Sequence, residues 1–277
     1  MSNPSNADQI AFWNGEAGEK WVKSQDRLDK MLAGISDEIV KTARAAPGEA
    51  ILDIGCGCGE TSLRLAKTAG RVVGIDISRP MLARAAQRAK DAGIANFKAI
   101  EADASDHSFG AEFDLLFSRF GVMFFADPDR AFANVRKSLK PGGRLAFVCW
   151  RDWRDNEWAR VPIAAARPHL PPQPPMGPED PGPFAFADLA RLRRILSSGG
   201  FDEITARPFD TQMHLGADHE EALAHTQEFG PVARMMAAAS DAEKAKAVAA
   251  LSAALKPFAD RKPFTLGGAV WIVTARI

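Results

Sequence analysis

Residues 50 to 59 read Ala-Ile-Leu-Asp-Ile-Gly-Cys-Gly-Cys-Gly, and this stretch decides the fold class. The apolar residues around Asp53 predict a buried strand, and the glycines that follow at every second position predict a tight, open loop. Glycine allows φ > 0 and removes the Cβ from the approach to the main chain. A ligand can therefore lie directly against the backbone at the carboxyl end of a parallel strand, where open α/β sheets bind ligands.

A second carboxylate narrows the class of ligand. Asp76 closes the apolar run Val72-Val73-Gly74-Ile75, about 20 residues after the loop, where a ribose-binding acid is expected. The dinucleotide fingerprint requires a small residue where this chain has Glu60, so that fingerprint fails. No Gly-Lys-Ser/Thr follows the loop, which excludes a phosphate-binding P-loop. A glycine loop that serves only as a turn is the alternative, and the second acid weakens it.

Composition favours a compact enzyme over a nucleic-acid or membrane protein. The 277 residues suit one α/β domain with insertions or two small domains, and lysine plus arginine equal aspartate plus glutamate. An extended nucleic-acid partner usually requires a basic face, and the sequence has no dense Lys/Arg tract. Cysteines occur only at positions 56, 58 and 149, which favours a reducing compartment. With no apolar run near ~18 residues and a polar start, we expect no membrane span and a cytoplasmic location.

Strand and helix patterns alternate as they do in a doubly wound sheet. Helical segments occupy residues 6 to 46, and apolar runs predict strands at 50–54, 71–76, 96–101, 113–117, 144–150, 201–209 and 268–277. After residue 150 the pattern is interrupted twice. Nine of the 18 prolines lie between Pro162 and Pro183, which predicts stiff, extended backbone that forms either a lid or a simple connector. Residues 217 to 256 form a second, helical insert.

The pattern Asp53-x-Gly55-x-Gly57-x-Gly59 resembles the signature of class I S-adenosylmethionine (SAM) dependent methyltransferases. Residues 113–118 (Phe-Asp-Leu-Leu-Phe-Ser) and 139–145 (Leu-Lys-Pro-Gly-Gly-Arg-Leu) resemble the ubiquinone/menaquinone-biosynthesis type of these enzymes. The resemblance is strong over residues 45–150 and weaker over 188–210 and 268–277. It implies a Rossmann-like, seven-stranded, mostly parallel sheet with an antiparallel last strand, N-terminal helices, and helical and proline-rich inserts forming a lid.

The resemblance also divides the chain into segments. They are an N-terminal helical cap (1–46), a SAM-binding core (47–150), a proline-rich lid or insert (151–187), a continuation of the core (188–215), a helical insert over the active site (216–262) and a final core strand (263–277).

Cofactor contacts follow from the resemblance position by position. Asp53 and the loop glycines would hold the methionine part of SAM, Asp76 the ribose hydroxyls, and Ser118, by its carbonyl, the amino group. Asp103 would bind the exocyclic amine of the adenine, with a helix or turn cap as the lesser alternative. Trp13 or Trp21 would shield the sulfonium, or would only pack on the sheet. The full predicted cofactor set is Trp13, Trp21, Asp53, Gly55, Gly57, Gly59, Asp76, Ile77, Met81, Asp103, Ala104 and Ser118.

The acceptor side is predicted at the exit of the fourth strand. Its many apolar side chains indicate a flat or apolar acceptor, bound by Arg119, Phe120, Met123 and Phe124. Trp150, at the end of the fifth strand, would extend this wall or only anchor the proline-rich segment. No catalytic base identifies itself, and the absence of tyrosine removes one common candidate. His169 and His214 are weak candidates, because a surface or capping role explains each of them better. The histidine spacing does not predict a metal site.

These observations predict a SAM-dependent methyltransferase acting on O or C of a small, largely apolar acceptor that is aromatic, quinone or polyketide-like. An N-methyltransferase of a polar metabolite or lipid headgroup is the first alternative. A non-catalytic SAM-binding regulatory protein and, more weakly, an NAD-dependent oxidoreductase are the others. The expected partner is the small-molecule acceptor, without nucleic acid, for a monomer or homodimer.

Overall fold

A computed structural model describes residues 6–173, 177 and 179–277. Two predicted segments therefore fall partly outside the described residues, namely the first five residues of the N-terminal cap and residues 174–176 and 178 of the proline-rich insert.

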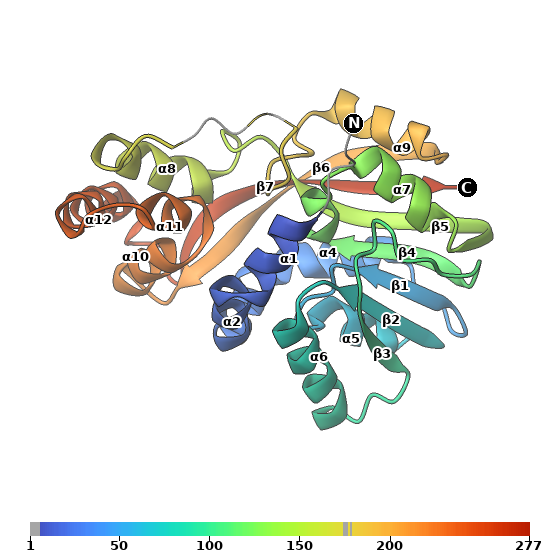
Figure 1. Cartoon of the computed structure of the whole chain (residues 1–277). Helices are drawn as coiled ribbons and strands as arrows, with labels where there is room; N and C mark the ends of the chain where they lie inside the picture. Colours follow the sequence, from blue (N-terminus) through green and yellow to red (C-terminus); the bar gives the residue numbers. More distant parts are fainter. Residues whose placement is uncertain (1–5, 174–176, 178) are drawn as a thin grey trace.

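The described residues form one seven-stranded sheet in the order β3-β2-β1-β4-β5-β7-β6 (Figure 1). Its first five strands are parallel, and β7 runs antiparallel to both β5 and β6. The predicted mostly parallel sheet with an antiparallel last strand is thus confirmed. The strands are β1 (Ala50–Ile54), β2 (Arg71–Asp76), β3 (Phe97–Glu101), β4 (Phe113–Arg119), β5 (Leu139–Trp150), β6 (Asp202–Gly216) and β7 (Phe264–Arg276).

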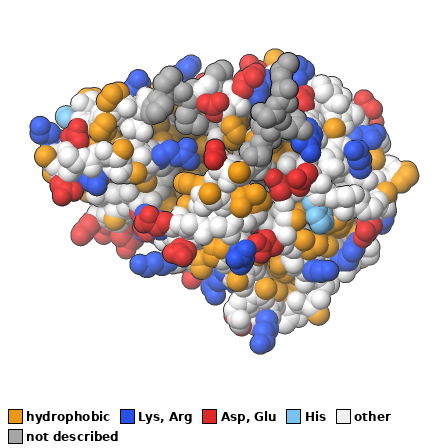
Figure 2. Space-filling view, in the orientation of Figure 1, with side chains coloured by type: hydrophobic (Ala, Val, Ile, Leu, Met, Phe, Trp, Pro, Cys, Tyr) orange, Lys and Arg blue, Asp and Glu red, His pale blue; other side chains and the backbone are white. Residues whose placement is uncertain are grey.

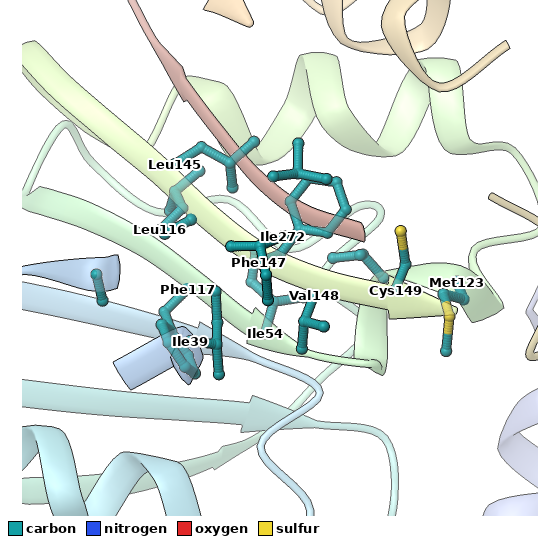
Figure 3. Packing of buried hydrophobic residues seen from close by; sticks show 14 of the residues in the cluster. Ile39, Ile54, Leu116, Phe117, Met123, Leu145, Phe147, Val148, Cys149 and Ile272 are labelled. Carbon is teal, nitrogen blue, oxygen red and sulfur yellow. The ribbon is translucent and has the colours of Figure 1, made fainter. Parts of the chain in front are cut away.

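Helices cover both faces of the sheet, as the continuous apolar sequences of its central strands require. α4 and α5 lie on one face, whereas α7 and α9 lie on the other (Figure 1). Figure 3 shows the packing that results at the centre, where Ile39 of α4 meets Phe117 of β4 and both are fully buried. The helices of this core are α4 (Ala33–Ala43), α5 (Glu60–Ala66), α6 (Arg79–Asp91), α7 (Pro128–Arg136) and α9 (Leu189–Ser198).

The predicted N-terminal cap contains two different kinds of helix. α1 (Ala7–Asn14) has no buried residue, and α2 (Glu16–Lys23) buries only Gly18. α3 (Gln25–Met31) leads from them into α4, which buries Ile35 and Ile39 and belongs to the core. Within the described part of the segment 1–46, α1 and α2 therefore contribute almost nothing to the buried core, whereas α3 buries Leu28.

The two inserts pack together into one lobe. It comprises α8 (Glu157–Ala166), η2 (Arg167–His169), α10 (His219–Glu228), α11 (Gly230–Met236), α12 (Asp241–Leu255) and η3 (Lys256–Phe258), at the left of Figure 1. This lobe has a hydrophobic cluster of its own, which includes Ala166, Val232 and Leu251. β6 and β7 carry it, because they continue to pair beyond the end of β5, out to Gly216 and Phe264.

Candidate active site

A pocket opens at the carboxyl ends of β1, β2, β3 and β4, beneath α1 and α2. The loops that follow these strands supply most of its lining, and α1, α2 and α3 close it from above. Of the residues predicted from the sequence, the pocket brings together Trp13, Trp21, Gly55, Gly57, Asp76, Ile77, Met81, Asp103, Ala104, Arg119, Phe120 and Phe124.

The glycine loop is shaped by the protein around it. Gly55, Gly57 and Gly59 all adopt left-handed backbone, with φ of +67°, +53° and +80°. A Cβ on Gly55 would lie 2.6 Å from the Cα of Gly121, and one on Gly59 would lie 2.9 Å from the Cβ of Ala85. Gly59 does not line the pocket, and its role is to let α5 pack closely against α6. The sequence predicted the position of the loop correctly. It did not predict that Gly55 and Gly59 also let the loop pack closely against Gly121 and Ala85.

Asp53 and Ser118 lie behind the pocket. Asp53 is fully buried and accepts hydrogen bonds from Ser62 Oγ at 2.6 Å and Thr61 Oγ1 at 3.2 Å, so it joins β1 to α5. Burial raises the pKa of Asp53 to about 7, although both hydroxyls oppose this shift. Ser118 donates to the carbonyl of Ile54 at 2.7 Å. Neither side chain reaches the pocket lining. Their hydrogen bonds instead hold in place the strands that carry the loop.

Asp76 and Asp103 do line the pocket. Asp76 accepts from the backbone N–H of Gly57 at 2.8 Å and of Ser78 at 2.9 Å, one bond on each carboxylate oxygen. Each oxygen keeps a second lone pair for a ligand hydroxyl. Burial raises the pKa of Asp76 above its ordinary value. Asp103 accepts from Ser105 N–H and from Asn6 Nδ2, both at 2.8 Å, so it both caps a turn and lines the pocket.

Aromatic side chains form the outer wall of the pocket. The ring of Trp13 meets Trp21 at 5.8 Å and Phe124 at 5.6 Å between centroids, both edge to face. Phe120 stacks on Trp150 at 4.4 Å, with Trp150 behind it and outside the lining. Met123 is only 1% exposed and belongs to the core. Of the five predicted acceptor-side residues, Met123 and Trp150 therefore support the wall without reaching its surface.

A charged cluster in and beside the pocket lining went unpredicted, apart from Arg119. Arg119 Nη1 lies 3.2 Å from Glu60 Oε2 and donates to Ser36 Oγ at 2.9 Å, and its Nη2 lies 4.0 Å from Asp29 Oδ1. Arg88 pairs with the other oxygen of Asp29 at 3.0 Å. Burial raises the pKa of Asp29 although both arginines lower it. Glu60 was recognisable at the end of the glycine loop, whereas nothing in its spacing distinguished Asp29.

The structure brings neither predicted base to the pocket. His169 lies in η2 of the lobe, and His214 pairs across β6 and β7 with Thr265. Cys58 lines the pocket, but burial raises the pKa of its thiol to about 12, so it is protonated at neutral pH. Among the described residues, no group of three or more His, Cys, Asp or Glu side chains could hold a metal ion. No helix within the described ranges is long and apolar enough to cross a membrane.

Comparisons with known proteins agree on one family. Residues 51–143 match the methyltransferase domain family. The aklanonic acid methyltransferase DauC of Streptomyces sp. (strain C5) is 31% identical over 163 residues, covering 57% of this chain and 70% of that protein. The cypemycin N-terminal methyltransferase of Streptomyces sp. is 29% identical over 155 residues, covering 54% of this chain and 58% of that protein. For uncharacterized mycobacterial relatives the chain spans about half their length, 51%.

Solved structures agree on the fold. The Haemonchus contortus phosphoethanolamine N-methyltransferase 2, in complex with SAM, superposes with a TM-score of 0.59 at 18% identity, covering 99% of this chain and 60% of that one. Fold, domain match and relatives together show that this chain belongs to the class I SAM-dependent methyltransferases.

Proposed function

We propose that the enzyme transfers the methyl group of SAM to an oxygen or carbon of a small, largely apolar acceptor of the aromatic, quinone or polyketide-like class. The observation that carries this proposal is the make-up of the pocket. Its outer wall is aromatic, and three of its charged side chains, Asp29, Glu60 and Arg119, already take part in ion pairs. A flat apolar acceptor suits such a wall, since aromatic rings prefer stacked and edge-to-face contacts.

The residues in the pocket suit SAM. Asp76 would accept the two ribose hydroxyls on its remaining lone pairs, and Asp103 would accept from the adenine amine. Ile77, Met81 and Ala104 would flank the adenine, while the backbone of Gly55 and Gly57 would meet the methionine part. When bound, SAM supplies a methyl group activated for in-line displacement. The protein contributes alignment of the two reactants and exclusion of water.

The paired charges argue against a cationic acceptor. Glu60 lies against Arg64 and Arg119, and Asp29 lies against Arg88, with Arg119 4.0 Å from its other oxygen. The negative charge of each carboxylate is already balanced by an arginine, so neither would attract an ammonium group strongly. The relative DauC, named for aklanonic acid, supports the proposed acceptor class.

A nitrogen acceptor is the second candidate function. It is favoured by the relative named as an N-terminal methyltransferase of cypemycin. Asp29 and Glu60 do face the pocket, so an amine that displaced Arg119 from them would find two carboxylates.

The test begins with calorimetric titration of SAM and, separately, NAD. We expect micromolar SAM binding and no response to NAD. Asp76→Asn should weaken SAM binding by about tenfold to a hundredfold, because hydrogen bonds to charged groups contribute about 1.5–3 kcal/mol. Asp91→Asn, an exposed acid at the end of α6, is the matched control and should bind SAM normally.

Acceptor class is then tested by release of S-adenosylhomocysteine (SAH). We expect release with phenolic, quinone or keto-acid acceptors and none with phosphoethanolamine or peptide amines. Turnover of amines alone would establish the second candidate. An Asp76→Asn protein that folds and binds SAM with unchanged affinity would remove Asp76 from the cofactor site.

A further inference from the structure

A second hollow lies beside the C-terminal part of α4. It has a volume of about 520 Å³ and is bounded by α4, the beginning of β5, β6 and the end of β7. Leu145 and Ala146 of β5 line it, whereas the pocket lies at the carboxyl ends of the parallel strands. The two hollows share no lining residue. We call this second hollow the basic groove.

The basic groove carries an excess of positive charge. Its five cationic side chains are Lys41, Arg44, Arg144, Arg207 and Arg276, and its lining carboxylates are Glu38 and Glu203. Arg207 pairs with Glu38, Arg276 with Glu203 at 3.4 Å, and Arg144 with Glu49 at 2.6 Å. Within the described part of the chain, Lys41 and Arg44 have no ion-pair partner. Two positive charges are therefore uncompensated, in a protein whose formal net charge is zero.

The end of α4 does not need these two charges. Cations near a helix C-terminus commonly offset its dipole and its free carbonyls. Here Arg144 performs that role, because its guanidinium donates to the carbonyls of Ala43 and Arg44 at 2.9 and 3.0 Å. Arg44 is held in left-handed backbone at φ +47°. Lys41 and Arg44 thus stay available on one wall of the groove.

The rest of the lining supplies neutral donors over an apolar floor. Thr42, Thr205 and Thr274 line the groove, and the hydroxyls of Thr205 and Thr274 lie 2.7 Å apart across β6 and β7. Leu145 and Ala275 are buried beneath them. Threonine hydroxyls and cationic side chains are the donors that bind phosphoryl and carboxylate oxygens.

We propose that the basic groove binds a small organic anion with at least two negative charges, such as a phosphorylated or polycarboxylate metabolite. Two uncompensated cations match two anionic groups, and the volume suits a small molecule. Lys41 and Arg44 form one wall, while Arg207 and Arg276 face the groove from the two strands. A ligand that reaches both walls would therefore use cations from separate elements. This site is independent of the cofactor and acceptor proposed above.

The test is calorimetric titration with pyrophosphate and with citrate at constant ionic strength, with acetate as the singly charged control. We expect saturable binding of one pyrophosphate or one citrate per chain, and none of acetate. Saturation by pyrophosphate alone would assign the groove to phosphoryl ligands, and by citrate alone to polycarboxylates. The double variant Lys41→Ala/Arg44→Ala should weaken that binding at least tenfold.

A matched control distinguishes loss of the basic groove from a general loss of positive charge. Lys67→Ala/Lys137→Ala removes two exposed lysines elsewhere and changes the net charge equally, so it should leave binding unchanged. Both double variants should bind SAM as the parent protein does, which shows that they fold. Equal weakening by both double variants, or no saturable binding of either anion, would overturn the proposal.

Discussion

At the end of β1, the two carboxylate oxygens of Asp53 have different surroundings. Oδ2 accepts from Ser62 and Thr61, whereas Oδ1 has no hydrogen-bond partner among the residues that the structure describes. Ionisation of this group in the interior is costly unless both oxygens are satisfied. Burial therefore outweighs the two hydroxyl bonds and raises the pKa of Asp53 to about 7.

This shift makes the free energy of unfolding depend on pH. The unfolded chain releases the proton near pH ~3.9, but the folded chain holds it up to pH of about 7. Between these values the folded state binds more protons, so stability falls as pH rises. We expect Asp53→Asn, which cannot ionise, to reduce the loss of stability between pH 5 and pH 8, as measured by urea unfolding at those two pH values.

The exposed Asp91 provides the comparison for this experiment. Asp91→Asn removes a carboxylate from the surface of α6 and should keep the pH dependence of the parent protein. If Asp53→Asn kept it too, Asp53 would be ionised in the folded protein throughout that range.

Among the elements, α1 lies over the pocket with few anchoring contacts. The carbonyl of Trp13 accepts from Ser78 Oγ at 2.7 Å, and Asn14 donates to the carbonyl of Ile77 at 2.7 Å. Both bonds tie α1 to the loop after Asp76. In Figure 2, hydrophobic side chains gather near the middle of the face where α1 lies in Figure 1, and Phe12 on this helix is 44% exposed. Helix α1 therefore owes its position to the pocket loop rather than to a core of its own.

We expect Trp13→Ala to weaken binding of SAM more than binding of SAH. Only SAM carries the positive sulfonium, and a cation over an indole ring gains about 0.5–2 kcal/mol. The difference between the two ligands should thus be roughly 2-fold to 30-fold. Calorimetric titration of each ligand against the same variant measures it directly.

Phe12→Ala is the control for Trp13→Ala. The ring of Phe12 packs edge to face on Trp13 at 5.2 Å but does not line the pocket. Its loss should leave the ratio of the two affinities as in the parent protein. An equal loss of SAM and SAH binding in Trp13→Ala would mean that Trp13 only packs in the cap.

The core elements were predictable because each has a local signal. Apolar runs located β1 and β2 to the residue. The ends of β6 and β7 were predicted too short, since their extension beyond β5 depends on pairing with each other. The hydroxyl of Ser78, the residue before α6, donates to the carbonyl of Trp13 and does not cap the helix. Local pattern therefore predicts elements well, and long-range contacts decide where they end.

Long-range contacts also limited what the sequence could predict about the site and about the molecule as a whole. Asp76 and Asp103 were predictable because Asp76 ends β2 and Asp103 follows the end of β3 by two residues, whereas Asp29 comes to the pocket only through the path of α3. Residues 151–187 and 216–262 were predicted as separate inserts. Their helices form one lobe because α12 packs against α8, a contact between segments with no shared sequence signal, whereas Phe186 of the first insert packs in the core of the sheet.

Since the lobe has its own hydrophobic cluster, it should lose stability separately from the sheet. Leu251 of α12 is fully buried in that cluster, and its truncation to alanine should cost about 2–5 kcal/mol. We expect Leu251→Ala to speed amide hydrogen exchange in α8, α11 and α12 while β1 to β5 keep their protection, because proteins open in cooperative units. SAM affinity should be unchanged, since the lobe does not line the pocket.

The comparison variant is Leu116→Ala, in the fully buried centre of β4. It removes the same atoms from the cluster that holds the sheet together, so exchange should rise in the sheet and in the lobe that β6 and β7 carry. Faster exchange in β1 to β5 of Leu251→Ala would show that lobe and sheet unfold as one unit. Selective exchange in the lobe would instead make the lobe the part of the enzyme that opens most easily, because it rests on a two-stranded ribbon beyond the end of β5.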